Sequence, residues 1–274
     1  MIGTLALLTS LTVILLGAGW LLGGIIGTGI ALFFAVAINF VSYWYSDRIV
    51  LKMYKAKPYE NKEIKKIIAE LAQEAEMPVP PLYIVETQVP NAFATGRNPK
   101  HAAVAVTRGI LDLDTDELKG VLAHEISHVK NRDTLISTMA ASIAGAISFL
   151  AQIGYYSMFF GGERKGEGSI FGMILIAIFA PLAALFVKLA ISRGREYKAD
   201  LTGAMLTKEP HYLASALRKI NETAKSYPMK GSAATAHLWI VNPFQGDWFV
   251  GLFSTHPPVE KRIARLEGME DYNK

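Results

Sequence analysis

The first 46 residues contain no Asp, Glu, Lys or Arg, and no other property of the sequence limits the fold as strongly. A helix needs about 20 apolar residues to cross the hydrocarbon layer of a membrane. The stretch is therefore long enough for two crossings, which we expect at 3–22 and 25–45, joined at Gly23-Gly24. A cleaved signal peptide would need a basic start and a shorter apolar core, so the sequence favours membrane helices.

Two further apolar runs lie at 135–159 and 169–191, separated by a short polar loop. Four runs of this length with so few charges do not suit the core helices of a soluble protein. The sequence therefore predicts a mainly α-helical membrane protein with four transmembrane helices. We divide the chain into two membrane helices, a first polar part, two more membrane helices and a second polar part, at 1–46, 47–134, 135–191 and 192–274.

Basic residues gather beside the ends of the expected spans, and they indicate on which side of the membrane the polar parts lie. Cytoplasmic loops of membrane proteins carry an excess of Lys and Arg. Here the bases follow the second and fourth spans, as Arg48, Lys52, Lys55, Lys57, Arg193, Arg195 and Lys198. Both polar parts are therefore expected in the cytoplasm, on a multi-pass protein of the cell membrane that is embedded in the lipid bilayer.

The net charge of +4 is explained by these flanking bases. A nucleic-acid surface would need a basic stripe with interleaved aromatic residues, and the sequence has none, so no nucleic-acid partner is expected. The absence of cysteine excludes disulfides, thiolate zinc sites and cysteine nucleophiles. A metal site in this chain must therefore use other ligands.

The two polar parts have the patterns of an α+β domain with a small β-sheet. Helical spacing of apolar residues predicts helices, and short apolar runs predict strands. The expected strands are 82–86, 91–96 and 102–107, and the expected helices are 64–75, 195–206, 210–226 and 258–268. Asp114 with Glu117 resembles a capping box, so another helix should begin near residue 115 and continue through His128. The stretch 228–257 is expected to be irregular.

The segment His124-Glu125-Ile126-Ser127-His128 carries the strongest chemical signal in the sequence. Two histidines at i and i+4 lie on one face of a helix, so both imidazoles can reach one metal ion. Glu125 is turned by about 100° from His124, which takes it out of the ligand row. This arrangement suits a base acting on a water at the metal, and it predicts a zinc-dependent hydrolase.

A catalytic zinc ion of this type needs a third protein ligand and one open position. A metzincin would have a histidine six residues after His128, where this chain has Thr134. The alternative is a glutamate from a later helix, and Glu196 is the best candidate. Asp200 follows four residues later on the same face and could accept a hydrogen bond from a ligating histidine. A charged, solvated helix end just outside the membrane would have the same spacing.

Three segments together resemble the HtpX family of membrane heat-shock metalloproteases, which are relatives of the CAAX prenyl proteases. They are His124-Glu125-x-x-His128, Glu196-x-x-Ala199-Asp200 and Thr255-His256-Pro257-Pro258. The segment Asn91–Gly96 and the order of spans and motifs are also similar to that family, and the likeness covers nearly the whole chain. The resemblance implies a gluzincin-like catalytic domain formed by the two polar parts, one zinc ion per chain, and Glu196 as the third ligand.

The same resemblance implies roles for two residues near the C-terminus. His256 would face the substrate and stabilise the oxyanion, and Arg262 would orient the substrate or support the oxyanion. For Asp133 two roles are open, support of a ligating histidine from behind or a place at the membrane interface, and the second is slightly favoured. Independently of the resemblance, we expect the strand at 102–107 to be an edge strand that binds the substrate backbone, through Ala102, Ala103, Val104, Ala105 and Val106.

Together these patterns predict an integral membrane zinc endopeptidase in which Glu125 is the general base. Both ligand-bearing helices extend expected spans, so the metal should lie close to the lipid boundary, where membrane proteins are the expected substrates. The resemblance implies a stress response role in protein quality control, through removal of misfolded or damaged proteins. The alternative is a proteolytically inactive membrane protein that keeps the metal site as a scaffold. Glu125 argues against it, because a structural site needs no base.

Overall fold

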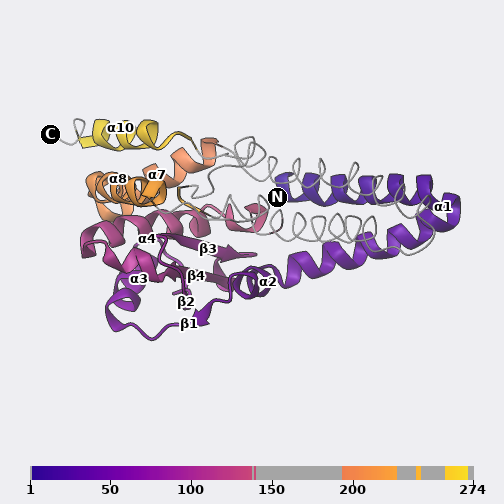
Figure 1. Cartoon of the computed structure of the whole chain (residues 1–274), viewed down its shortest axis with the longest axis horizontal. Helices are drawn as coiled ribbons and strands as arrows, with labels where there is room; N and C mark the ends of the chain where they lie inside the picture. Colours follow the sequence, from indigo (N-terminus) through magenta and orange to yellow (C-terminus); the bar gives the residue numbers. More distant parts are fainter. Residues whose placement is uncertain (1, 138, 140–192, 227–238, 242–256, 271–274) are drawn as a thin grey trace.

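The computed structural model describes residues 2–137, 139, 193–226, 239–241 and 257–270 (Figure 1). In these ranges the chain is mostly helical, with one small mixed sheet. The expected span at 169–191, nearly all of the one at 135–159 and most of the expected irregular stretch at 228–257 lie outside the described residues.

The N-terminal apolar stretch forms α1, Ile2–Trp44, which folds back on itself at Gly24. Gly24 has a φ of 56°, a left-handed conformation that glycine adopts without steric cost. Across the two limbs, Asn39 Nδ2 donates a hydrogen bond to Thr12 Oγ1 at 3.0 Å. The predicted turn at Gly23-Gly24 is therefore confirmed. In the part of the chain that the structure describes, the limb Gly24–Trp44 is the one helix long and apolar enough to cross a membrane.

Two short helices and a strand lead from α1 into the polar part. They are α2, Ser46–Met53; β1, Lys57–Pro58; and α3, Lys62–Glu74. The Asn61 side chain caps α3 by accepting a hydrogen bond from the Ile64 N–H at 3.0 Å. The apolar face of α3 is buried, as its amphipathic pattern predicts.

The sheet contains β1, β2 (Leu82–Val85), β3 (Ala92–Gly96) and β4 (Ala102–Thr107), in the order β1-β2-β4-β3. Strand β4 pairs in parallel with β2 and antiparallel with β3. The prediction that 102–107 is an edge strand is therefore wrong. Its residues, Ala102, Ala103, Val104, Ala105 and Val106, are all buried. A continuous run of small and β-branched apolar residues is typical of a strand that is buried on both faces. The edge strands of the sheet are β1 and β3.

Helix α4, Thr115–Lys130, lies between the sheet and the helices α7, Arg193–Thr207, and α8, Pro210–Ser226 (Figure 1). The predicted capping box of Asp114 and Glu117 is present at its start. Helix α10, Val259–Glu270, packs against α7 and α8. Short 3-10 turns, η1 (Pro99–His101) and η2 (Arg108–Asp112), flank β4.

Two close helix contacts hold α4 in its place. A Cβ on Gly203 of α7 would lie 3.1 Å from the backbone N of His124, and a Cβ on Gly120 of α4 would lie 2.5 Å from the backbone N of Leu213. Because neither glycine has a side chain, α7 and α8 approach the α4 backbone closely. The Glu117 carboxylate adds a polar link, since it accepts hydrogen bonds from Ser215 at 2.6 Å and Lys219 at 2.8 Å. These contacts bring α7 against the turn of α4 that carries His124.

Candidate metal centre and active site

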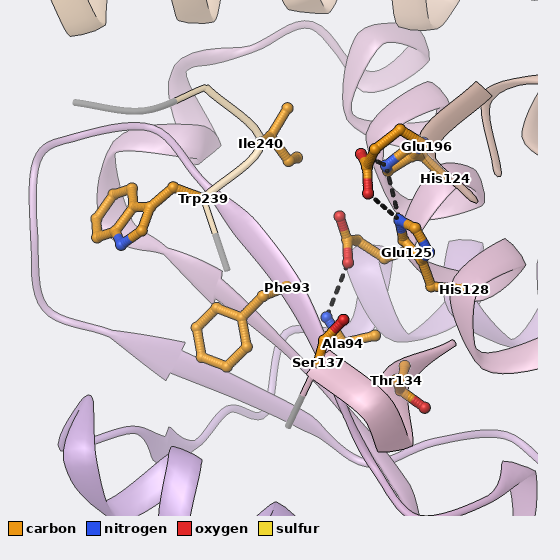
Figure 2. Close-up of a pocket in the computed structure, with 10 residues that line it drawn as sticks. All are labelled: Phe93, Ala94, His124, Glu125, His128, Thr134, Ser137, Glu196, Trp239 and Ile240. Carbon is orange, nitrogen blue, oxygen red and sulfur yellow. Dashed lines mark hydrogen bonds and ion pairs between the residues drawn. The ribbon is translucent and has the colours of Figure 1, made fainter. Parts of the chain in front are cut away.

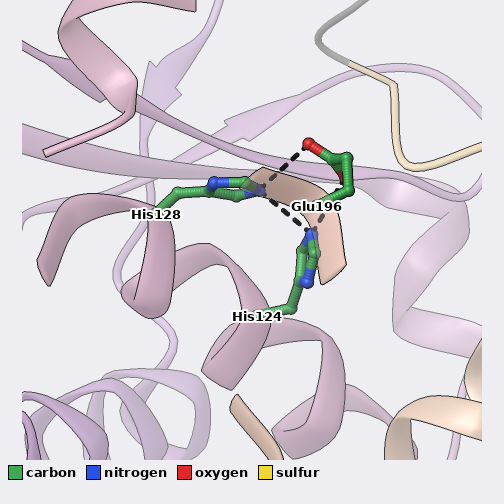
Figure 3. A group of neighbouring side chains, drawn as sticks. All are labelled: His124, His128 and Glu196. Carbon is green, nitrogen blue, oxygen red and sulfur yellow. Dashed lines mark hydrogen bonds and ion pairs between the residues drawn. The ribbon is translucent and has the colours of Figure 1, made fainter. Parts of the chain in front are cut away.

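Three side chains from two helices converge at the middle of the domain (Figure 3). His124 and His128 project from one face of α4, and their Nε2 atoms are 3.2 Å apart. Glu196 enters from the first turn of α7, with its carboxylate oxygens 3.7 Å from His124 Nε2 and 3.5 Å from His128 Nε2. The structure thus brings Glu196 to the two histidines, although it follows His128 by 68 residues in the sequence.

The spacing of these atoms suits a divalent cation. One donor atom from each of the three residues lies within 4.8 Å of the others. A tetrahedral zinc ion with bonds of about 2.0–2.1 Å holds its ligands about 3.4 Å apart. The three separations are close to that value, so His124, His128 and Glu196 fit a zinc ion without rearrangement of the helices.

Asp200 and Arg262 lie behind His124. Asp200 Oδ1 is 3.0 Å from His124 Nδ1, on the side of the ring that faces away from Glu196 and His128. Arg262 donates to both Asp200 oxygens, from Nη2 at 2.6 Å and from Nε at 2.9 Å. All three side chains are buried. The pair therefore holds the imidazole of His124 with Nε2 directed into the metal centre.

The charges of this group shift its proton equilibria. Burial and Arg262 lower the pKa of His124, but the carboxylates of Asp200 and Glu196 outweigh them and raise it to about 9. Burial raises the pKa of Asp200, whereas Arg262 and the hydrogen bond to His124 hold it well below its usual range. Asp200 is therefore a carboxylate, and a metal ion must compete with a proton for His124.

The position of Arg262 does not fit the predicted contact with the substrate. Its side chain is fully buried, and Nη1 also donates to the carbonyl of Ile240 at 3.4 Å. It is not among the residues that line the active-site pocket. The resemblance implied a substrate role, but the guanidinium is paired with Asp200, and its Nη1 lies 3.9 Å from Glu196 Oε2.

Asp133 lies beside the second histidine, which is the less favoured of the two roles that the sequence left open. Its Oδ2 is 3.6 Å from His128 Nδ1. The chain reaches this position through a tight turn after α4, in which Arg132 has a φ of 60°. A carboxylate thus stands behind each histidine. The only sequence signal was an acidic residue five positions after His128, which by itself is too common to be informative.

Glu125 lies between the metal centre and the sheet. Its Oε2 accepts a hydrogen bond from the backbone N–H of Ala94 in β3 at 2.8 Å (Figure 2). The side chain is buried, and this burial raises the pKa of the carboxyl above its ordinary value, against the opposing effect of His124 and His128. A carboxyl group with a raised pKa is better suited to take up a proton near neutral pH.

Strand β3 presents its open edge to Glu125. Asn91 O accepts a hydrogen bond from Thr107 N at 2.9 Å, so this pair joins β3 and β4 at one end. Hydrogen-bonded pairs alternate along an antiparallel ladder. The backbone groups of Ala92, Ala94 and Gly96 therefore point away from β4, as the bond from Ala94 to Glu125 illustrates. This edge, and not that of β4, borders the pocket.

The pocket is lined by residues of α4 and α7 and by residues of three other segments, namely Phe93, Ala94, His124, Glu125, His128, Thr134, Ser137, Glu196, Trp239 and Ile240 (Figure 2). Trp239 and Ile240 carried no recognisable sequence signal. Asn91 positions them, because its Oδ1 accepts a hydrogen bond from Ile240 N at 2.9 Å. His256, which the resemblance placed at the site, lies outside the described residues.

Comparison with known proteins gives the same assignment as the geometry. Residues 58–270 match the model of peptidase family M48. A protease HtpX homolog of Pyrococcus furiosus is 54% identical, with 95% of this chain and 92% of that protein covered. A protease HtpX homolog of Desulforapulum autotrophicum is 49% identical, with 98% and 90% covered.

The crystal structure of Ste24p from S. mikatae aligns with a TM-score of 0.46 and 20% identity, over 86% of this chain and 56% of that one, and we base no argument on it. The family match covers well over half of the chain, and the relatives match over nearly all of it. The chain therefore belongs to peptidase family M48 and is a membrane metalloprotease of the HtpX type.

Proposed function

We propose that the chain is a multi-pass membrane zinc endopeptidase that hydrolyses peptide bonds of membrane or misfolded proteins at the cytoplasmic face. One observation carries the proposal. The Glu125 carboxylate lies beside the His124, His128 and Glu196 group and is hydrogen-bonded at 2.8 Å to the open edge of β3. A base, a set of metal ligands and a backbone edge that can align an extended peptide thus meet in one pocket.

One zinc ion per chain would be held by His124, His128 and Glu196. Bound there, it would supply Lewis-acid activation of a water molecule and of the scissile carbonyl. Asp200 and Asp133 would keep the two imidazoles oriented from behind, at 3.0 Å and 3.6 Å from their Nδ1 atoms. Arg262 would act through Asp200, as a positioning residue.

The residues of the chain would carry the proton transfers and the alignment of the substrate. An extended substrate would add to the open edge of β3, where the backbone of Ala92 and Gly96 points outward. Glu125 would release its bond to Ala94, take a proton from the attacking water and return it to the leaving amine. His256 would support the oxyanion, as the sequence motif Thr255-His256-Pro257-Pro258 implies.

The membrane setting supports substrates that are presented at the lipid surface. The limb Gly24–Trp44 of α1 can cross a membrane by its length and composition. Basic residues follow this limb, and others follow the apolar run that precedes α7, so the positive-inside rule favours a cytoplasmic active site. Removal of damaged membrane proteins is the role that agrees with this placement.

Two variants separate the roles of the site residues. Glu125→Gln should keep one zinc ion per chain but cleave a casein or membrane-protein substrate at least about 100-fold more slowly, because the proton acceptor is lost. Glu196→Gln should lose most of the bound zinc. Glu70→Gln, on the exposed face of α3, is the matched control and should change neither property.

Full proteolysis by Glu125→Gln would refute the assigned base and favour another nucleophilic mechanism. An unchanged zinc content in Glu196→Gln, measured by elemental analysis, would remove Glu196 from the ligand set. Cysteine substitutions at Lys62 and Lys165 test the topology, because the chain has no other cysteine. Labelling of both positions from the same side of a sealed membrane would contradict the cytoplasmic placement.

A further inference from the structure

A recess of about 580 Å³ lies where α1 ends and the sheet begins. Three segments line it: the last turn of α1 and the residue after it, the first turn of α2, and the turn that follows β3. The lining side chains are Phe40, Trp44, Tyr45, Asp47, Arg48, Arg97 and His101. Aromatic rings and cationic groups thus line one concave surface. The segments that carry them are distant in the sequence but adjacent in the fold.

The recess is at the level where a membrane would end. The limb Gly24–Trp44 of α1 exposes large apolar side chains, including Phe33 and Phe34, along its length. Trp44 and Tyr45 follow at its end and are also exposed. Amphipathic aromatic rings of this kind are enriched at membrane–water interfaces. Trp44 and Tyr45 therefore mark the headgroup region of the bilayer, and the recess lies beside them.

The two arginines in the recess are held by aromatic rings. The Arg97 guanidinium lies 4.8 Å from the centre of the Trp44 ring, and Nη1 donates to the carbonyl of Trp44 at 2.9 Å. The Arg48 guanidinium lies 5.7 Å from the centre of the Tyr45 ring. Within the described ranges, neither arginine forms an ion pair with a carboxylate.

These contacts leave donors for an anion. A guanidinium group carries five N–H donors in a planar fork that matches a phosphate, and Arg97 uses one of them on Trp44. Asp47 is the one carboxylate among the lining residues, against two arginines and His101. The recess is therefore net basic, rimmed by aromatic rings, and open at the lipid boundary.

We propose that this recess binds the phosphate headgroup of an anionic phospholipid. The proposal goes beyond the peptidase activity and rests on the placement of α1 in the membrane. Arg97 directly follows Gly96, the last residue of β3, and Ala94 of the same strand reaches Glu125. The bound phosphate thus lies at the membrane end of the strand that borders the active site.

The test uses the full chain, purified in a neutral detergent, and native mass spectrometry to count bound lipids. Phosphatidylglycerol and phosphatidylcholine with the same acyl chains are added separately, and inorganic phosphate is added as a competitor. We expect phosphatidylglycerol to bind about tenfold more tightly than phosphatidylcholine, because each basic residue near a membrane surface favours anionic lipid. The Arg48→Gln/Arg97→Gln variant should lose this preference, and inorganic phosphate should not displace the lipid.

A double variant with the same charge change serves as the control. Arg108→Gln/Arg218→Gln removes two exposed arginines outside the recess. Arg108 lies at the other end of the sheet from Arg97, because Gly96 pairs with Ala102 and Ala92 pairs with Val106. The control should keep the preference for phosphatidylglycerol. The single variant Arg48→Gln, whose side chain is exposed, should show a partial loss even if the double variant folds poorly.

Several outcomes would overturn the proposal. One is an unchanged lipid preference in both recess variants, and another is an equal loss in the control, which would indicate general surface charge. If inorganic phosphate displaced phosphatidylglycerol when both were present at equal concentrations, the recess would bind a free anion and not a lipid. Release of the chain from membranes by alkaline carbonate would remove the lipid boundary itself. Loss of the lipid site in a membrane-integral, proteolytically active chain would leave the proposed function standing.

Discussion

Asp200 Oδ1 lies 3.0 Å from His124 Nδ1, and this contact determines which ring nitrogen of His124 faces the metal centre. The carboxylate accepts the proton of Nδ1, so that Nε2 remains available as a ligand. Arg262 holds the same carboxylate with two hydrogen bonds, at 2.6 Å and 2.9 Å. Asp200 thus links Arg262 to His124 through buried contacts, and the first two predictions concern the removal of either partner of His124 in this series.

Asp200→Asn should lower zinc affinity by about 10- to 100-fold, as is found when the hydrogen-bond acceptor behind a ligating histidine is removed. The amide keeps the size of the side chain but removes the charge that orients the imidazole. The measurement is a competition titration with a zinc chelator. Asp112→Asn, an exposed position in η2, is the control. Equal affinities in the two variants would mean that Asp200 does not orient His124.

Arg262→Met should destabilise the metal-free protein by about 3–5 kcal/mol, because it removes the guanidinium that forms two hydrogen bonds to the buried Asp200 carboxylate. The double variant Asp200→Asn/Arg262→Met should lose much less than the sum of the single variants, since it removes both charges. Denaturant unfolding in detergent measures these differences. Simple additivity would show that the two side chains are not energetically coupled.

Glu117→Gln should destabilise the protein by about 1–3 kcal/mol at neutral pH, because the hydrogen bonds to a buried, charged carboxylate are weakened or lost. Burial raises the pKa of the Glu117 carboxyl, but the bonds from Lys219, Ser215 and the Asp114 backbone outweigh it and hold the pKa below its ordinary value of 4.5. A depressed folded pKa contributes stability that is complete above the unfolded value and is lost as pH falls through the folded value.

The difference in stability between wild type and Glu117→Gln should therefore be constant above about pH 5 and shrink as the pH falls below 4.5. Unfolding curves recorded from pH 7 to pH 3 measure it. A difference that grows on acidification would contradict the direction of the pKa shift.

Gly203→Val should weaken zinc binding and destabilise the protein by about 1–3 kcal/mol, because the added side chain pushes α7 away from α4. A Cβ at this position lies 3.1 Å from His124 N, and Glu196 is on the same helix as Gly203. Gly268→Val is the matched control, since a Cβ there meets nothing within 4 Å. Equal thermal stability and zinc content in the two variants would indicate that the close contact does not set the ligand geometry.

Structural features that depend only on residues close together in the sequence could be predicted from the sequence. The turn at Gly24, the capping box of Asp114 and Glu117, and the common face of His124 and His128 each follow from the spacing of a few residues along one helix. Backbone conformation and helical periodicity decide such features, and both are local. The strands were located for the same reason, because short apolar runs between turn residues mark them wherever they pair.

The order of the strands and the partners of the buried charges depended on the tertiary structure. The sequence identified 102–107 as a strand but not its neighbours, because pairing with both β2 and β3 is decided by how the chain crosses between them. The predicted role of Arg262 was a contact with the substrate. In the structure, α10 packs against α7, and the Arg262 side chain is hydrogen-bonded to Asp200. Asp133 lies beside His128 because the chain turns at Arg132, and no rule of sequence spacing predicts this turn.

The sequence by itself determined the apolar hairpin, the helix that carries two histidines and a glutamate, and, through its likeness to a known family, the choice of Glu196 as their partner. The tertiary structure alone decided that Glu125 meets the open edge of β3 and that Asp133 stands behind His128. The reason is physical. Helix periodicity acts over a few residues, whereas these contacts join segments that only the packing of α4 between the sheet and α7 brings within bonding distance.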